Sequence, residues 1–388
     1  MTPKLDIFSR IKNGINNMMI PTHYVPILKW KRAEQNSIKN LYDSQKDHLT
    51  PLIELVMPKA KPFKDKAKKI KKKDDEILIE LISEFENERI PQIPEEIRKA
   101  WGQRPIYVDF SLLYPLQLRT ESITGIFTLG SALGLNLIPV LNLNDDEVIK
   151  KTISSISKII CLRLVSSDLS SIGLLNKKIS VFLNLYDLSE TNIDLLIDLK
   201  EINEEGGSYQ RFMSASQSIE KLLDWRNLIF ASGAFPEDMT KCTIDDMNKL
   251  PRFDWINWYN NVSSGRLLRN PIFSDYTIRH PIYRESLQFF APTTTIKYTS
   301  EKEWFVMKGK KQKFELYLAN AYLLLADTSI FYGESFSYGD QYIAEKGKHY
   351  PLYMKDPKIG GTGSTETWIM AGINHHLACT IDQIGKLS

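Results

Sequence analysis

The sequence predicts an α/β protein of the (β/α)8, or TIM-barrel-like, class with a C-terminal β-hairpin and helical elaboration. Eight short apolar runs follow one another at intervals long enough to hold a helix. Several of the runs are apolar at nearly every position, which is typical of parallel strands covered on both faces. Most runs also end near a polar residue, at the place where barrels of this class carry their sites.

The eight runs are the expected barrel strands, and amphipathic stretches between them are the expected helices. Strands are expected at residues 24–31, 51–56, 105–110, 137–142, 159–165, 179–185, 228–232 and 271–275. Helices are expected at residues 34–49, 76–88, 95–101, 122–133, 145–157, 169–176, 189–203, 216–225 and 254–262. Several of these helices begin at Ser or Asp, which are favoured N-cap residues.

After Pro281 the alternation of strand and helix stops. Residues 293–299 and 303–307 alternate between apolar and polar side chains, which predicts an antiparallel hairpin. Helices are expected at residues 314–326, 338–347 and 365–383. The last of them has an apolar stripe that must be buried, and we expect it to close over the mouth of the barrel. The expected organisation is a lead-in at 1–22, a barrel at 23–281 with a Lys-rich insertion at 57–104, and a cover at 282–388.

The composition is that of an ordinary globular protein, and it excludes several classes. The chain has 388 residues, a net charge of +3 and three cysteines without paired spacing, which we interpret as reduced thiols. No apolar run approaches the ~20 residues of a membrane span, and the polar N-terminus lacks a signal-peptide core. We therefore expect a cytoplasmic protein that does not associate with membranes.

Nine lysines between residues 59 and 73 form the one strongly charged block. One interpretation is a loop that attracts phosphate or docks a partner. The other is a solvated lysine run beside the acidic stretch at 74–88, and we favour it. The small net charge disfavours nucleic acid as a partner without excluding it.

Charged residues near the strand ends are the candidate catalytic groups. They are Lys29, Lys31, Glu54, Asp109, Arg163, Asp187 and Asp275. Lys29 and Lys31 lie two residues apart, so they share a strand face and could bind phosphate or carboxylate, or form a Schiff base. The carboxylates could act as acid and base or hold a divalent cation, and the absence of histidine ligands favours Mg²⁺ or no metal over zinc. We assign no metal-ligand residues. The alternative is a structural network in which these charges neutralise one another.

A second set of candidates consists of possible binding residues in the last loops and in the cover. They are Ser232, Tyr276, His280, Asp340, His375 and His376. Loops after the last two strands of a barrel often bind phosphate. His375 and His376 are adjacent on a helix and point about 100° apart, so they cannot both bind one metal ion from one face. We expect one of them to be packed and the other to face the mouth.

Five segments carry a resemblance to a known family. They are YVPILKWK at 24–31 with Glu34, PLIE at 51–54, VDF at 108–110, FSDY at 273–276, and WIMAGINHH at 368–376. In this order and spacing the chain, from about residue 24 to 381, resembles the Beta family of prophages and satellite phages. Its FSDY segment departs from the expected FGDY, which puts in doubt that a glycine is needed there.

The resemblance implies a role in conflict between phage and host. It suggests a component of an anti-phage defence or toxin–antitoxin-like locus, which suppresses a toxic partner. The partner would be a toxin-like or phage protein bound at the barrel rim. The alternative is a barrel enzyme acting on a phosphorylated metabolite, a nucleotide or nucleic acid, with an anionic or phosphate-bearing ligand. The family supplies no established catalytic residues that could be assigned to this chain.

Overall fold

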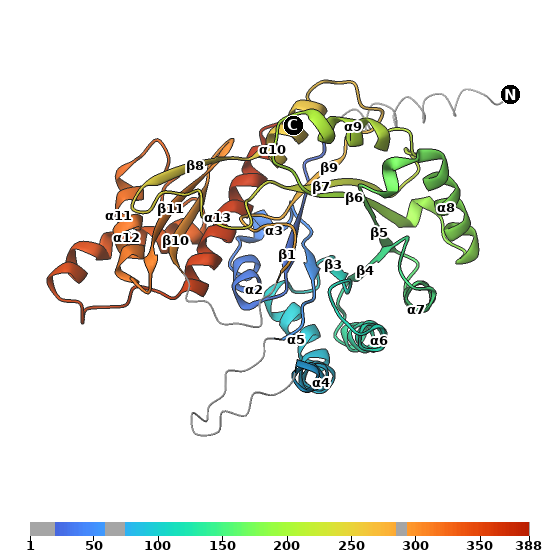
Figure 1. The fold of residues 1–388 in the computed structure, drawn as a ribbon, viewed down its shortest axis with the longest axis horizontal. Helices are drawn as coiled ribbons and strands as arrows, with labels where there is room; N and C mark the ends of the chain where they lie inside the picture. The colour runs from blue at the N-terminus through green and yellow to red at the C-terminus, as the bar shows by residue number, and fades with distance from the viewer. Residues whose placement is uncertain (1–19, 59–73, 285–292, 388) are drawn as a thin grey trace.

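Eight parallel strands form a closed barrel in the order β1-β2-β3-β4-β5-β6-β7-β9, with helices around it (Figure 1). This confirms the predicted fold class. The computed structural model describes residues 20–58, 74–284 and 293–387. The lysine run at 59–73 and most of the lead-in at 1–22 lie outside the described residues.

The barrel strands and the helices that surround them account for most of the first 280 residues. The strands are β1 (Tyr24–Lys29), β2 (Leu52–Glu54), β3 (Ile106–Asp109), β4 (Leu137–Asn142), β5 (Ile160–Val165), β6 (Ile193–Glu201), β7 (Asn227–Gly233) and β9 (Ile272–Asp275). The helices are α2 (Arg32–Lys39), α3 (Asp43–Lys46), α4 (Asp74–Glu84), the π-helical turn η1 (Phe85–Arg89), α5 (Ile90–Ala100), α6 (Leu116–Ala132), α7 (Glu147–Ile156), η2 (Asp168–Ser170), α8 (Ile172–Leu185), η3 (Glu190–Asn192), α9 (Gly207–Ser216) and α10 (Phe253–Val262).

The prediction of the sixth strand is wrong. Residues 179–185 belong to helix α8, whereas the region predicted as a helix at 189–203 contains strand β6. Short apolar runs do not distinguish a buried strand from a buried helix. In α8 the buried Leu175, Ile179 and Phe182 recur at helical spacing and pack against the barrel. The expected helix at 216–225 is also absent, since α9 ends at Ser216.

Alternation along each strand gives the barrel an apolar interior. The inward-facing apolar side chains form one buried cluster. Its members are Val25, Ile27, Leu52, Tyr107, Ile138, Val140, Cys161, Leu196, Ile229, Ala231, Ile272 and Tyr276. Each strand therefore presents alternate residues to the interior, with the intervening residues under the helices. The three cysteines are buried and unpaired.

A second, three-stranded antiparallel sheet lies beside the barrel, in the order β10-β11-β8 (Figure 1). The strands of this sheet are β8 (Met247–Pro251), β10 (Thr293–Thr299) and β11 (Glu303–Lys311). Three helices follow it in the chain, α11 (Glu315–Ala326), α12 (Tyr338–Lys355) and α13 (Thr365–Gly385). The β10–β11 pair confirms the predicted hairpin. The third strand, β8, comes from the connection between β7 and α10, which the apolar pattern does not reveal.

Helix α13 packs against β1, α2, β10 and α12. It therefore covers the wall between the first and last barrel strands, where the barrel's closing helix belongs, and the expectation that it closes over the mouth is wrong. Ser364 caps the helix by accepting a hydrogen bond from Thr367 N. Where α12 crosses α13, a side chain at Gly339 would overlap the carbonyl oxygen of Ala371. None of the described helices is both long and apolar enough to span a membrane.

Candidate functional site

Charged side chains from five strands meet inside the barrel at the carboxyl ends of its strands. Together with one tyrosine they form what we call the mouth cluster, which consists of Lys29, Glu54, Asp109, Arg163, Asp198, Lys200 and Tyr276. Strand register explains part of this convergence. Lys29 lies beside Glu54 in the β1–β2 ladder, and Glu54 lies beside Asp109 in the β2–β3 ladder. In-register residues of parallel strands point to the same face.

Arg163 of β5 is the centre of the mouth cluster. Its Nη1 donates to Glu54 Oε1 at 2.9 Å and also to Asp109. Its Nε and Nη2 donate to Asp198 Oδ2 at 3.0 and 2.6 Å. The planar guanidinium offers five donors in a fixed geometry, which suits it to hold several carboxylates at once.

Two lysines complete the charge balance of the mouth cluster. Lys29 Nζ pairs with Glu54, and Lys200 Nζ lies 3.1 Å from Asp198 Oδ2 and 3.7 Å from Glu54 Oε1. Lys200 Nζ also donates to the hydroxyl of Tyr276 at 3.0 Å, and that hydroxyl donates to Asp198 at 2.7 Å. Three cations thus face three carboxylates around one phenol.

Burial and neighbouring charges together lower the pKa values of two carboxylates and one lysine in the mouth cluster. Burial alone would raise the pKa of Asp198, but Lys200 and Arg163 outweigh it and hold that pKa below its usual range. The same balance, with Arg163 and Ser111 as the stabilising groups, lowers the pKa of Asp109. Burial, reinforced by Lys200 and Arg163, lowers the pKa of Lys29 well below its usual value. Lys29 therefore holds its proton less firmly than an exposed lysine does, although it pairs with Glu54.

Lys200 is the member of the mouth cluster that reaches solvent. The side chain of Lys200 is 35% exposed, whereas those of Glu54 and Asp198 are 1% exposed or less. The ring of Tyr283 lies near Lys29 at the end of β1 and near Lys31 just after it. Its centroid is 5.6 Å from Lys29 Nζ and 4.7 Å from Lys31 Nζ. A ligand that enters the mouth would meet ammonium groups before it meets carboxylates.

The structure does not bring Asp275 into the mouth. Its side chain points outward from β9, where Tyr24 donates to Oδ1 at 2.5 Å and His376 Nε2 lies 2.9 Å from Oδ2. The other ring nitrogen of His376 is 2.9 Å from Thr299 Oγ1. The prediction that one of the two histidines faces the mouth is therefore wrong. Burial lowers the pKa of His376 despite the opposing charge of Asp275, so this histidine joins α13 to the barrel as a neutral group.

His375 and Asp340 lie farther from the mouth, within the C-terminal elaboration. His375 Nδ1 is 2.8 Å from Asp340 Oδ2, and its Nε2 is 2.7 Å from the carbonyl oxygen of Thr299. Tyr298 donates to Asp340 at 2.7 Å and stacks on the imidazole with a centroid distance of 3.8 Å. These groups are fully buried, and they hold α12 and α13 against β10.

The remaining candidates lie in three different places. Asp187 follows α8 and precedes β6, so it lies at the opposite end of the barrel and is fully exposed. Ser232 faces outward from β7, and its buried hydroxyl has no partner among the described residues. His280 lies on the rim, with Nε2 3.6 Å from Glu201 Oε1. Of the predicted catalytic set, Lys29, Glu54, Asp109 and Arg163 come together, and so does Tyr276 of the predicted binding set.

Asp198 and Lys200 are the site residues that the sequence analysis missed, because their strand was predicted as a helix. The signal is present in the segment IDLLIDLKE of β6, where Asp194, Leu196, Asp198 and Lys200 recur at every second position. Within the described ranges, no group of three or more His, Cys, Asp or Glu side chains is arranged to hold a metal ion. Of the four carboxylates considered as Mg²⁺ ligands, Glu54 and Asp109 come together and accept hydrogen bonds from Arg163, whereas Asp187 and Asp275 lie elsewhere.

The fold and the mouth cluster define a (β/α)8-barrel protein with a buried ionic site at the carboxyl ends of its strands. The chain belongs to the Beta protein family, whose model matches residues 24–382. No curated protein matches the sequence significantly.

Two solved structures show a remote similarity to the chain. An endo-beta-N-acetylglucosaminidase from Cordyceps militaris in apo form has a TM-score of 0.28 at 10% identity, over 69% of this chain and 85% of that chain. A GH138 enzyme targeting pectin rhamnogalacturonan II has a TM-score of 0.32 at 9% identity, over 76% of this chain and 38% of that chain. The chain spans less than half of the second enzyme, and at these values neither similarity bears on activity.

Proposed function

We propose that the mouth cluster is the working site of this protein and that it recognises an anionic group, such as a phosphate or carboxylate. The observation that supports this most is the burial of two cations, Lys29 and Arg163, with three carboxylates inside the barrel. Removing these five charged groups from water costs several kcal/mol each, and apolar side chains of similar volume would pack at lower cost. Such an arrangement is typical of a functional site.

The charge distribution supports an anionic ligand. Lys200 is the part of the cluster that reaches solvent, and Lys31 lies beside the same entrance. The carboxylates lie deeper and are already held by Arg163. An incoming phosphate or carboxylate would compete with Asp198 for Lys200 and would bring its charge close to two ammonium groups.

At the cellular level, we propose that the protein is a component of a phage-encoded anti-phage locus and restrains a toxic partner. Membership of the Beta family supports this proposal. In this account the anionic group in the mouth is carried either by that partner or by a small molecule that signals infection.

An enzyme that acts on a phosphorylated metabolite or nucleotide is the second candidate. The favouring observation is Lys29, whose lowered pKa and contact with Glu54 would let it act as a base or a nucleophile. Lys29→Arg separates the candidates, because arginine keeps the charge but cannot release a proton. A binding protein retains function in this variant, whereas an enzyme loses it.

The experiment that tests the working site is a plaque assay in cells carrying the native locus, combined with thermal unfolding of the purified variants. Lys200→Met removes the solvent-facing cation without emptying the buried part of the cluster. We expect protection to be lost while the unfolding midpoint changes by only a few degrees. Unchanged protection would contradict the proposal.

A further inference from the structure

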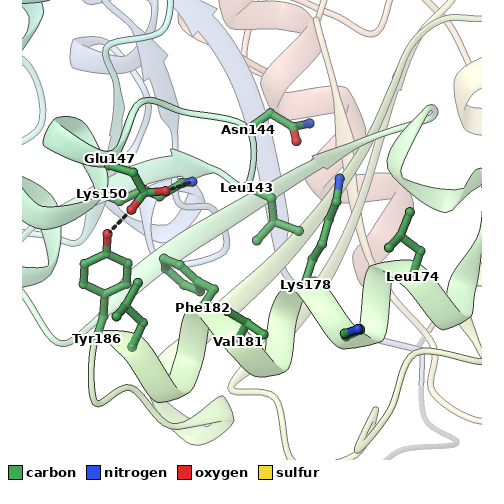
Figure 2. A pocket seen from close by; sticks show the side chains of 11 residues that line it. Leu143, Asn144, Glu147, Lys150, Leu174, Lys178, Val181, Phe182 and Tyr186 are labelled. Carbon is green, nitrogen blue, oxygen red and sulfur yellow. Dashed lines mark hydrogen bonds and ion pairs between the residues drawn. The ribbon is translucent and has the colours of Figure 1, made fainter.

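A groove on the outer wall of the barrel lies between α8 and the segment that leads into α7 (Figure 2). Its volume is about 380 Å³, and its apolar lining includes Leu143, Leu174, Val181, Phe182 and Leu185. Figure 1 shows α8 on the side of the barrel away from the sheet β10-β11-β8. The groove therefore lies apart from the C-terminal elaboration, and none of its lining residues belongs to the mouth cluster.

Helix α8 has apolar side chains on two faces, although one face would suffice to pack it on the barrel. Leu175, Ile179, Phe182 and Leu183 form the buried face. Leu174, Val181 and Leu185 form a second stripe at spacings of seven and four residues, and they are 55%, 57% and 65% exposed. At about 100° per residue this stripe is turned by roughly 125° from the buried face, so packing on the barrel leaves it uncovered. Exposed apolar stripes of this kind mark interaction surfaces.

The charges around the groove are positive. Lys177 and Lys178 are exposed, and within the described part of the chain no carboxylate pairs with either of them. The acidic residue of the lining, Glu147, is already engaged by Lys150 at 2.8 Å and by the hydroxyl of Tyr186 at 2.7 Å (Figure 2). A partner that covers the apolar stripe would therefore also contact two ammonium groups, which could form ion pairs with acidic side chains of that partner.

We propose that the α8 groove binds an amphipathic helix of another protein, with an apolar stripe flanked by acidic residues. The stripe from Leu174 to Leu185 is about 16 Å long at 1.5 Å per residue, which matches three turns of a helix laid along it. Charge complementarity selects an acidic helix over a basic one. A symmetric pairing of α8 with a second copy of this chain is disfavoured, because it would place the lysines of both copies against one another.

The test uses a hydrocarbon-stapled 18-residue helical peptide that carries one leucine stripe with glutamates on both sides. The matched peptide has lysines in place of the glutamates, and binding to the full chain is measured by fluorescence anisotropy. We expect the acidic peptide to bind and the basic peptide to bind at least tenfold more weakly. Raising the salt concentration should weaken the binding of the acidic peptide.

Two double variants localise the binding. We expect each of two double variants, Lys177→Glu/Lys178→Glu and Val181→Ser/Leu185→Ser, to lower the affinity for the acidic peptide at least tenfold. The control Lys355→Glu/Lys358→Glu makes the same change of charge on exposed residues at the end of α12 and beyond it, and should change affinity less than twofold. All the altered side chains are exposed, so the variants should retain the wild-type circular dichroism spectrum.

Three outcomes would overturn the proposal. They are no binding of the acidic peptide, equal binding of the two peptides, and equal effects of the groove and control variants. Self-association of the wild-type chain that Val181→Ser/Leu185→Ser abolishes would also overturn it, since the occupant of the groove would then be a second copy of this chain.

Discussion

Replacing Arg163 with methionine tests whether the mouth cluster holds ionised carboxylates. The substitution keeps much of the side-chain volume and removes the donors to Glu54, Asp109 and Asp198, each of which is 1% exposed or less. Breaking one buried ion pair costs about 3–5 kcal/mol. Because Arg163 serves three carboxylates, we expect a loss of at least about 4 kcal/mol at pH 7, out of the ~5–15 kcal/mol that stabilises a typical protein.

The loss should depend on pH in a defined direction. In the wild type, the pKa values of Asp109 and Asp198 are below their usual range, so their ionised forms stabilise the fold above about pH 4. This stabilisation is lost as the pH falls through the folded-state pKa values. Without Arg163 both pKa values should rise, and that of Asp109 should rise above its value in the unfolded chain, because Arg163 is its main compensating charge whereas Asp198 keeps Lys200. The variant should then gain stability as the pH falls from 7 to 5, and the difference from the wild type should narrow.

Urea unfolding followed by far-UV circular dichroism at pH 7 and pH 5 measures both effects. The control is Arg104→Met, because the pairs that Arg104 makes with Asp43 and Asp47 at 3.4 Å are exposed and should contribute less than about 1 kcal/mol. A loss of less than about 1 kcal/mol for Arg163→Met at pH 7, or a difference that does not change with pH, would refute the ionised cluster.

Three further predictions concern the C-terminal elaboration. Burial lowers the pKa of Lys297 to about 7, below the value of an unfolded chain, so stability should rise with pH between about 7 and 10. Lys297→Met should therefore unfold at a higher urea concentration than the wild type at pH 7 and lose this advantage at pH 10. His376→Ala leaves the buried Asp275 without its imidazole partner and should cost about 1–3 kcal/mol, whereas Lys386→Ala at the exposed end of α13 should cost less than about 0.5 kcal/mol. Truncation after residue 358 removes α13 and uncovers the wall of β1, so the shortened chain should lack a cooperative thermal transition; a sharp transition near that of the full chain would show that α13 is not the closing helix.

The barrel was predictable because its parallel strands are buried on both faces and therefore form continuous apolar runs. The exception is instructive. Strand β6 carries Asp194, Asp198 and Lys200 on its inward face, so its apolar content falls below that of α8, which precedes it. The sequence pattern therefore favours the wrong segment, because the inward-facing charges of β6 conceal the strand.

The mouth cluster was predictable in part, for the same reason. Lys29, Glu54 and Asp109 end their strands and Arg163 lies in the second half of β5, all in strands that the sequence identifies correctly, so their convergence follows from the topology. Asp275 also ends a correctly identified strand, but it occupies the outward position of the alternation and meets His376 instead. A shift of one residue along a strand changes the face, and strand limits inferred from sequence are not accurate enough to settle it.

The most direct test of the central claim is the effect of Lys200→Met on protection against phage, measured beside its thermal unfolding midpoint. Lys200 contacts Asp198 and Tyr276 within the mouth cluster and is also its most exposed charge. If the mouth is the working site, the variant fails to protect cells although its midpoint stays within a few degrees of the wild type. If the cluster is only structural, the variant protects cells as well as the wild type does.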